Sequence, residues 1–302
     1  MTVLVNMIVT LGMLGIVPLG LLLIDPDGLR RTARIWPYAA APGAVCLWLP
    51  RGAPAVTLAA LYAVAALALA ARVPVRLLRL RARALARTRS GESRPHGATA
   101  AEAAVLTALA SPAVAATALV AERSGYRLFG FDLDILALTV PHFHYAGFTA
   151  ALVAGLVCRA AAAGNTGRGS GSRRARWAAF SVPGGTLLVL IGYFVDDWAE
   201  LAGAVVLTAG MWLVALVTWQ EIRPAAPDRR TRALLAVSAA VLGATMVLAL
   251  WWALGEATGI PHPTLTWMAA THGLGNALGF ALCSVLAWRR LAAGPRPEET
   301  TP

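Results

Sequence analysis

The chain has 302 residues, of which 58% are apolar and only 14% are charged, and its mean hydropathy is +0.65. Soluble domains carry about 25% charged residues, so this composition excludes an ordinary soluble fold, and the apolar excess excludes intrinsic disorder. The net charge of +11 comes from 26 arginines and no lysine. Because these arginines lie in clusters between apolar runs, they argue against nucleic-acid binding and for a membrane protein.

Apolar runs of about 20 residues recur along the chain and predict an all-α, polytopic transmembrane helix bundle of about nine spans. The second run is short and holds Pro37 and Pro42, so residues 35–71 form either two crossings or a re-entrant pair. The three cysteines lie inside apolar runs without a motif spacing, which predicts free thiols. The expected spans cover roughly 3–24, 35–50, 53–71, 98–121, 133–158, 177–195, 198–219, 233–255 and 264–288.

Arginines mark one side of this bundle. Connections after the first, third, fifth and seventh spans, together with the C-terminal tail, hold 23 of the 26 arginines. Only Arg51, Arg123 and Arg127 fall in the other connections. Because positive loops stay in the cytoplasm, the pattern predicts an outside N-terminus and a cytoplasmic C-terminus.

One bundle, residues 1–293, is the only domain expected. Residues 72–97 and 159–176 form its basic cytoplasmic loops, which we expect to contact anionic membrane lipids. Arginines at helical spacing between 72 and 87 suggest that the third span continues as a basic surface helix. Residues 294–302, rich in Pro, Glu and Thr, are predicted to be a disordered tail.

The fifth span contains the sequence Pro141-His-Phe-His-Tyr-Ala-Gly-Phe148. If this span begins near residue 133, His142 lies about 14 Å into the membrane. His142 and His144 point about 200° apart on a regular helix, although a proline-loosened turn could change that. One alternative is that a histidine only bonds a backbone carbonyl between packed helices. We favour a functional role because two histidines and Tyr145 lie near the membrane midplane.

The ninth span contains Thr271-His-Gly-Leu-Gly-Asn-Ala-Leu-Gly-Phe280. His272 and Asn276 lie one turn apart and share a face with Gly275 and Gly279. The two glycines are typical of close helix packing. His272 would lie about 12 Å deep, near the level of the fifth-span histidines, so it is a further candidate site residue.

Carboxylates gather at the predicted outer ends of the spans. Asp196 and Asp197 suit a solvated hairpin turn, whereas Glu200 begins the apolar face of the next span and is a candidate acid or base. Asp132, at the mouth of the fifth span, is either a solvated loop residue or a substrate contact.

These motifs resemble the YndJ-like family of bacterial integral membrane proteins. The resemblance rests on His142-Phe-His-Tyr-Ala-Gly-Phe148, on Glu200 and on Thr271-His-Gly-Leu-Gly-Asn-Ala-Leu-Gly-Phe280, and it is strongest over about 130–290. It implies a membrane fold more than an activity, although members are sometimes labelled transporters. The arginine- and alanine-rich composition is typical of a high-GC actinobacterium.

Three functions fit these residues. The first is an intramembrane acid–base enzyme of cyclase or isomerase type. Its catalytic residues would be His142, His144, Glu200, His272 and Asn276. Its substrate would be a lipophilic isoprenoid- or polyketide-like molecule, a class chosen from polarity alone.

Aromatic side chains would line the substrate pocket and stabilise a cationic intermediate. The candidates for substrate binding are Tyr145, Phe148, Trp198, Trp267 and, at the mouth, Asp132.

The second function is a transporter or proton-coupled carrier, since intramembrane His and Glu are relay groups; the sequence shows no internal repeat of the usual kind. The third is a redox protein in which His142 or His144, with His272, binds haem or a metal. No cofactor is predicted for the first function, and no nucleic acid is expected as a partner.

Overall fold

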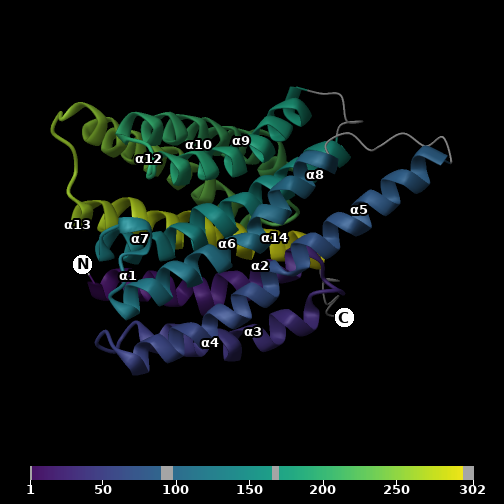
Figure 1. Ribbon diagram of the computed structural model, residues 1–302. Helices are drawn as coiled ribbons and strands as arrows, with labels where there is room; N and C mark the ends of the chain where they lie inside the picture. The colour runs from purple at the N-terminus through teal and green to yellow at the C-terminus, as the bar shows by residue number, and fades with distance from the viewer. Residues whose placement is uncertain (1, 90–97, 165–169, 295–302) are drawn as a thin grey trace, which may run out of the picture.

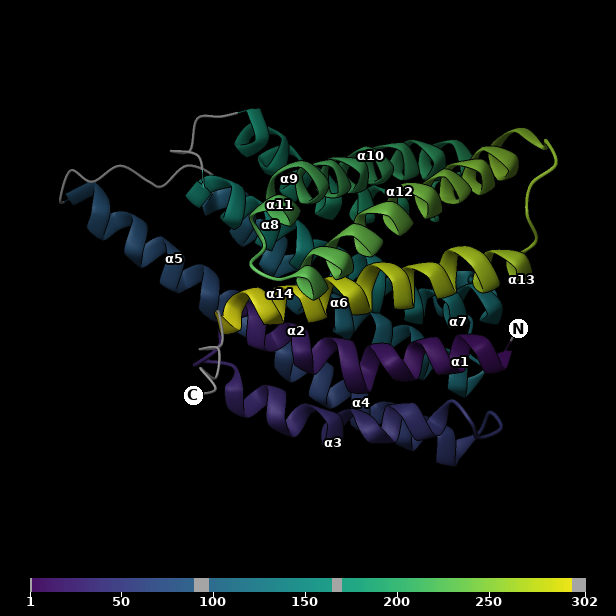
Figure 2. The same cartoon turned by 180° about the vertical axis from the view of Figure 1, so that it is seen from behind.

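The computed structural model describes residues 2–89, 98–164 and 170–294, and within these ranges the chain is helical without a strand. Nine long helical segments run back and forth through one bundle (Figures 1 and 2). The early segments are α1 (Thr2–Leu11), η1 (Gly12–Ile16), α2 (Val17–Ile24), α3 (Arg30–Cys46), α4 (Ala53–Ala70), α5 (Arg72–Arg89) and α6 (Ala98–Ser124). The later ones are η2 (Leu128–Gly130), α7 (Leu133–His142), η3 (Phe143–Ala150), α8 (Ala151–Gly164), α9 (Ser170–Gly192), α10 (Asp197–Val217), η4 (Thr218–Ile222), α11 (Arg223–Ala225), α12 (Arg229–Thr258), α13 (Leu265–Met268), η5 (Ala269–Gly273), η6 (Gly275–Leu282) and α14 (Cys283–Ala293).

The prediction of an all-α transmembrane bundle with about nine spans is confirmed. Eight of the described helices are long and apolar enough to cross a membrane. The ninth, α3, has 17 residues, holds arginines in its first turns and packs against α2 and α4 at the edge of the bundle (Figure 1). At about 1.5 Å per residue it reaches about 25 Å, so it is shorter than the other helices of the bundle, which have 22 to 35 residues.

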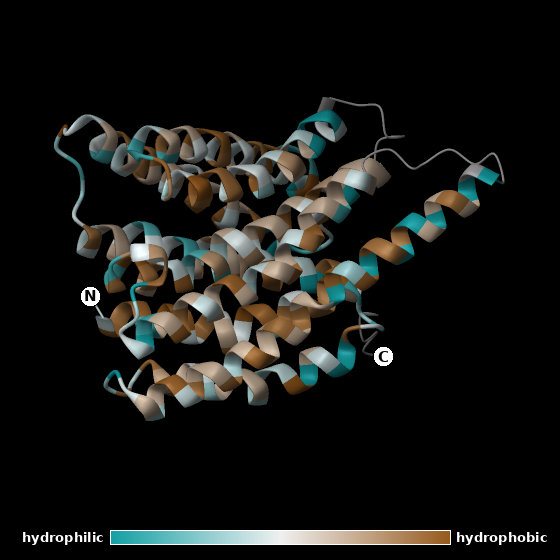
Figure 3. Ribbon diagram, in the orientation of Figure 1, coloured by the Kyte–Doolittle hydropathy of each residue, from teal (hydrophilic) through white to brown (hydrophobic). Residues whose placement is uncertain are grey.

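Helix extends into both basic connections, as the arginine spacing predicts for the first of them. After a break at Ala71, α5 continues the direction of α4 and projects beyond the bundle, with polar and apolar residues alternating along it (Figure 3). The second connection, 159–176, is mostly taken up by the end of α8 and the start of α9. The predicted loop residues 90–97 and 165–169, and the predicted tail from residue 295, lie outside the described residues.

The described arginines gather at one end of the bundle. The α2–α3 turn, α5, the end of α8, α11 and the end of α14 all lie at one end of the bundle, opposite the start of α1 (Figures 1 and 2). Charges near both ends are paired. Glu102 binds Arg76 and Arg159 at 2.8 and 3.3 Å near the arginine-rich end, and Glu122 binds Arg51 at 2.9 Å and also Arg123 at the other.

Five segments of the described helices are π-helical, with one extra residue per turn. π-Bulges interrupt regular helices and frequently accompany functional sites. Here η3 follows His142 directly, η5 contains His272, and η6 contains Asn276. Candidate residues from the fifth and ninth spans therefore lie in or beside irregular helix.

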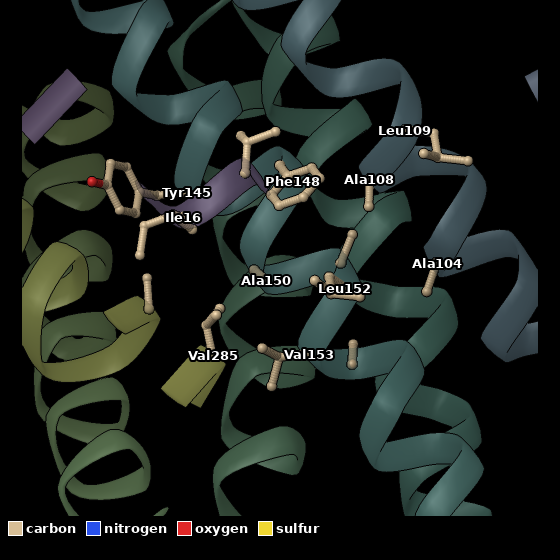
Figure 4. Close-up of a cluster of buried hydrophobic side chains, with 14 of the residues drawn as sticks. Ile16, Ala104, Ala108, Leu109, Tyr145, Phe148, Ala150, Leu152, Val153 and Val285 are labelled. Carbon is tan, nitrogen blue, oxygen red and sulfur yellow. The ribbon is translucent and has the colours of Figure 1, made fainter. Parts of the chain in front are cut away.

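A tightly packed core lies between α2, α6, η3 and α8 (Figure 4). Phe148, Leu152 and Ile16 are fully buried in it. Gly20 allows the close approach, since a Cβ there would lie 2.7 Å from the Phe148 ring. Alanines such as Ala104 and Ala108 let α6 approach the same cluster (Figure 4), as expected where packing rather than hydrophobicity drives association in a membrane.

Candidate functional site

A cavity of about 220 Å³ lies between the first, fifth, sixth, seventh, eighth and ninth spans. Most of its wall is apolar, and methionines from three different helices contribute to it. Helices α3, α4 and α6 contribute nothing to the wall. The polar residues on the wall are His142, Tyr145, Tyr193, Glu200, Trp252, His272 and Asn276.

His142 enters the cavity from the last turn of α7. Its side chain is surrounded by protein and is nevertheless exposed, because the exposed surface borders the cavity. Among the described residues its ring nitrogens have no hydrogen-bond partner. A neutral imidazole carries one donor and one acceptor, so both are available to a bound molecule.

His272 and Asn276 form a closed network with Thr245 of α12. The His272 Nδ1 donates to the Thr245 carbonyl oxygen at 2.8 Å, so its Nε2 is the acceptor and receives the Asn276 amide at 3.2 Å. The Thr245 hydroxyl donates to the Asn276 Oδ1 at 2.8 Å. Because its members bond one another, this network forms a polar wall that fixes η5 and η6 against α12.

Glu200 lies in the first turn of α10, where its carboxyl group faces the cavity. Asp196 caps this helix by accepting from the Ala199 backbone N–H at 2.8 Å, as aspartate often does at a helix N-terminus. Gly192 brings the end of α9 so close that a Cβ there would lie 2.4 Å from the Glu200 Cα. Glu200 is only 9% exposed, and no hydrogen bond to its carboxylate joins it to any other described residue.

His144 points away from the cavity, contrary to the grouping made from the sequence. It is fully buried; its Nδ1 donates to the Val140 carbonyl oxygen at 2.7 Å, and its Nε2 accepts from the Tyr62 hydroxyl at 2.8 Å. The physical reason is the 200° separation of residues i and i+2 on a helix, which the π-helical turn does not remove. The interpretation that one histidine only joins packed helices therefore describes His144.

Of the residues predicted to bind substrate, only Tyr145 lines the cavity, where its hydroxyl donates to the Ile8 carbonyl oxygen at 2.7 Å. Phe148 packs in the core (Figure 4). Trp198 and Trp267 are 61% and 45% exposed on the outside of the bundle, as aromatic residues near a membrane interface often are. Asp132 forms a surface ion pair with Arg127 at 2.7 Å.

Sequence reasoning missed several residues of the wall. Tyr193 is the first residue after α9 and lines the cavity. The only sequence feature that could have pointed to it is the acidic turn, which begins three residues later. Met211, Met246 and Met268 come from three helices, and nothing in their local sequence distinguishes them from ordinary core methionines.

The YndJ-like protein family model matches residues 7–280, which cover nearly the whole bundle. The chain belongs to the YndJ-like family. The match reaches all eight helices that are long and apolar enough to cross a membrane, although the first begins before it and the last continues beyond it. Searches of curated proteins and of solved structures find no match to this YndJ-like chain.

No three His, Cys, Asp or Glu side chains of the described ranges lie close enough together to hold a metal ion. In addition, both ring nitrogens of His272 are engaged by protein groups. The metal and haem hypotheses therefore gain no support from the donor geometry of the described residues. The unpaired side chains of His142 and Glu200 are available to a molecule bound in the cavity.

Proposed function

We propose that this YndJ-like protein is a multi-pass enzyme of the cell membrane that moves protons on a lipophilic small molecule. One observation carries the proposal: an imidazole and a carboxyl group, each without a protein partner in the part of the chain that the structure describes, face a single apolar cavity. Enzymes use such positioned groups as general acid and base. A polar group withdrawn from water and left unpaired costs free energy, which a functional role explains.

The chemistry that fits is the isomerisation or cyclisation of an alkene. Glu200, in its protonated form, donates a proton to one carbon of a C=C bond, which leaves a cation on the substrate. Neutral His142 removes a proton from a neighbouring carbon, and the electrons of that C–H bond form the new C=C bond. Return of the proton from His142 to Glu200 restores both groups, so the reaction needs no oxidant or cofactor.

The rest of the wall suits a substrate of this kind. Tyr145, Tyr193, Trp252 and Phe280 contribute aromatic rings, whose faces stabilise a cation. Three methionines add flexible, polarizable surface that adapts to an apolar ligand. Isoprenoid- or polyketide-like polyenes combine the required apolarity with reactive double bonds.

The test is turnover of polyene lipids by protein purified into nanodiscs, followed by mass spectrometry and by deuterium incorporation from D₂O. We expect His142→Gln and Glu200→Gln each to reduce turnover by about 100-fold or more, the usual contribution of a general acid or base. His262→Gln, in the turn between α12 and α13, is the matched control and should retain turnover.

Unchanged turnover in both cavity variants would contradict the proposal. Uptake of unmodified compound by proteoliposomes under a pH gradient, without any product, would show a proton-coupled carrier instead.

A further inference from the structure

A second, smaller cavity adjoins the first, and His142 lines both. It has a volume of about 20 Å³ and lies between α7, η3, α9 and α10. Tyr193 also borders both cavities, from the turn after α9. The two residues therefore meet at the boundary between the large cavity and the small one.

The small cavity fits one water molecule. A site needs about 10–15 Å³ of probe-occupied volume and two to four polar partners to hold a water. Besides His142 and Tyr193, the polar residues that line it are Thr139 and Thr186. Their hydroxyls donate to the carbonyl oxygens of Ile135 and Val182, at 2.8 and 2.9 Å, so the hydroxyl oxygens retain capacity to accept from a water.

Tyr193 is the remaining link toward Glu200. Its ring packs edge-on against Phe131, with 6.2 Å between ring centres, which fixes its orientation. Its hydroxyl has no hydrogen-bond partner within the described ranges and lies close enough to Glu200 to interact electrostatically. Burial raises the pKa of Tyr193, and Glu200 raises it further, so the phenol stays protonated and can both donate and accept.

The charged neighbours of this path belong to several elements. Glu200 interacts electrostatically with Asp197 on its own helix and with Glu256 on α12. Glu256 is in turn paired with His262 at 3.1 Å. His142 faces His272 across the large cavity. Of these groups only His142 lines the small cavity.

We propose that Tyr193 and one water molecule in the small cavity connect Glu200 with His142, so that a proton passes between the two groups without crossing the substrate cavity. The inference rests on the proposed function, because it supplies the return step of that reaction. The water accepts the proton of protonated His142 while it gives one to the Tyr193 oxygen, and Tyr193 gives its own proton to the Glu200 carboxylate. One O–H bond is made and one broken at each relay oxygen, and the relay groups end neutral.

The connection can be measured without any substrate. The chain has five histidines, so ¹⁵N-histidine labelling in nanodiscs gives a simple spectrum, and His142→Gln assigns the His142 signal. We expect Glu200→Gln to shift the pH midpoint of the His142 ring, because the connected groups sense each other's protonation. In a Tyr193→Phe background, we expect Glu200→Gln to shift the pH midpoint of the His142 ring by no more than a third of the wild-type shift.

Matched variants distinguish the proposed Tyr193–water connection from general effects of a substitution on the cavities. Tyr145→Phe removes another hydroxyl from the large cavity, but one bonded to a backbone carbonyl, and should leave the full shift. Thr186→Val removes a hydroxyl from the small cavity and should reduce it. Phenylalanine at position 193 keeps the ring contact with Phe131, and the signals of the other histidines report whether the fold is preserved.

Equal midpoint shifts in wild type and Tyr193→Phe backgrounds would overturn the proposal, and so would the absence of any shift in wild type. A full shift in Thr186→Val would overturn the role of the water. These outcomes are independent of turnover: coupling without product formation contradicts the proposed enzyme and not the connection.

Discussion

His142 and His144 are two residues apart on one helical segment and have different roles in the structure. His142 is open to the cavity, whereas both ring nitrogens of His144 are used, one by a backbone carbonyl and one by Tyr62 on another span. Tyr62 also contacts Trp36 edge-on, with 6.2 Å between ring centres, and Trp36 donates to the Met13 carbonyl oxygen at 2.9 Å. His144 thus belongs to a buried cluster that joins α3, α4, η1 and η3.

Tyr62→Phe tests this cluster. Loss of the hydroxyl leaves a buried nitrogen of His144 without a partner, which costs about 1–3 kcal/mol. We expect the free energy of unfolding, measured by SDS titration in mixed micelles, to fall by that amount. Tyr38→Phe is the control, because Tyr38 is 79% exposed and its hydroxyl has no described partner. Equal stability of the two variants would contradict the role of His144 as a structural link.

The site could be predicted only in part, because sequence spacing orders residues on one helix and not between helices. His272 and Asn276, which are four residues apart and were predicted to share a helix face, form a direct hydrogen bond. Thr245, 27 residues earlier, completes that network and has no local signal. Tyr193 and the cavity methionines were missed for the same reason. Trp198 and Trp267 have suitable chemistry, but the rotation of their helices directs both rings out of the bundle.

Helices α9 and α10 form the most closely packed hairpin of the bundle. Glycines on both helices contact backbone of the partner: a Cβ at Gly185 would lie 2.5 Å from the Leu207 Cα, and one at Gly203 would lie 2.5 Å from the Val189 nitrogen. Small residues allow such approaches between membrane helices. The hairpin carries Glu200 and Leu207, so its spacing shapes the wall of the cavity.

Adjacent glycines of α9 provide a matched test. Gly185→Ala forces the two helices apart, and overpacking of this kind costs about 1–3 kcal/mol. A Cβ at Gly184 would meet nothing within 4 Å, so Gly184→Ala should be neutral or stabilising by up to about 1 kcal/mol, since alanine favours the helix. Thermal unfolding in the same detergent compares them, and a larger loss in Gly184→Ala would contradict the described packing.

For the molecule as a whole, charge and hydropathy predict most of the helices. For the site, they predict few of the contacts between residues. Long apolar runs define the helices because a membrane leaves few other structures for the backbone. The boundaries differ where helix extends into the charged ends, as at α3, α5 and α9. The three arginines outside the predicted pattern are all ion-paired, since Arg51 and Arg123 share Glu122 and Arg127 pairs with Asp132. Counting arginines in each connection does not take these ion pairs into account.

A crossing by α3 in addition to the eight longer helices would place the two ends of the chain on opposite sides of the membrane. We predict that a tag at the N-terminus is accessible from outside and that a C-terminal tag is protected in intact cells and exposed after lysis. Protease protection measures both. Two tags on the same side would show that α3 does not cross and would leave eight spans.

The π-helical segments also constrain how related genes can vary in length. Each π turn holds one residue more than a regular turn, and removing one residue from a helix rotates everything beyond it by about 100°. A one-codon deletion inside 143–150 would therefore rotate the segment that follows it relative to His142, and one at 273–275 would change the spacing of His272 and Asn276. Insertions and deletions at these positions should be rarer among homologues than in the surface turns.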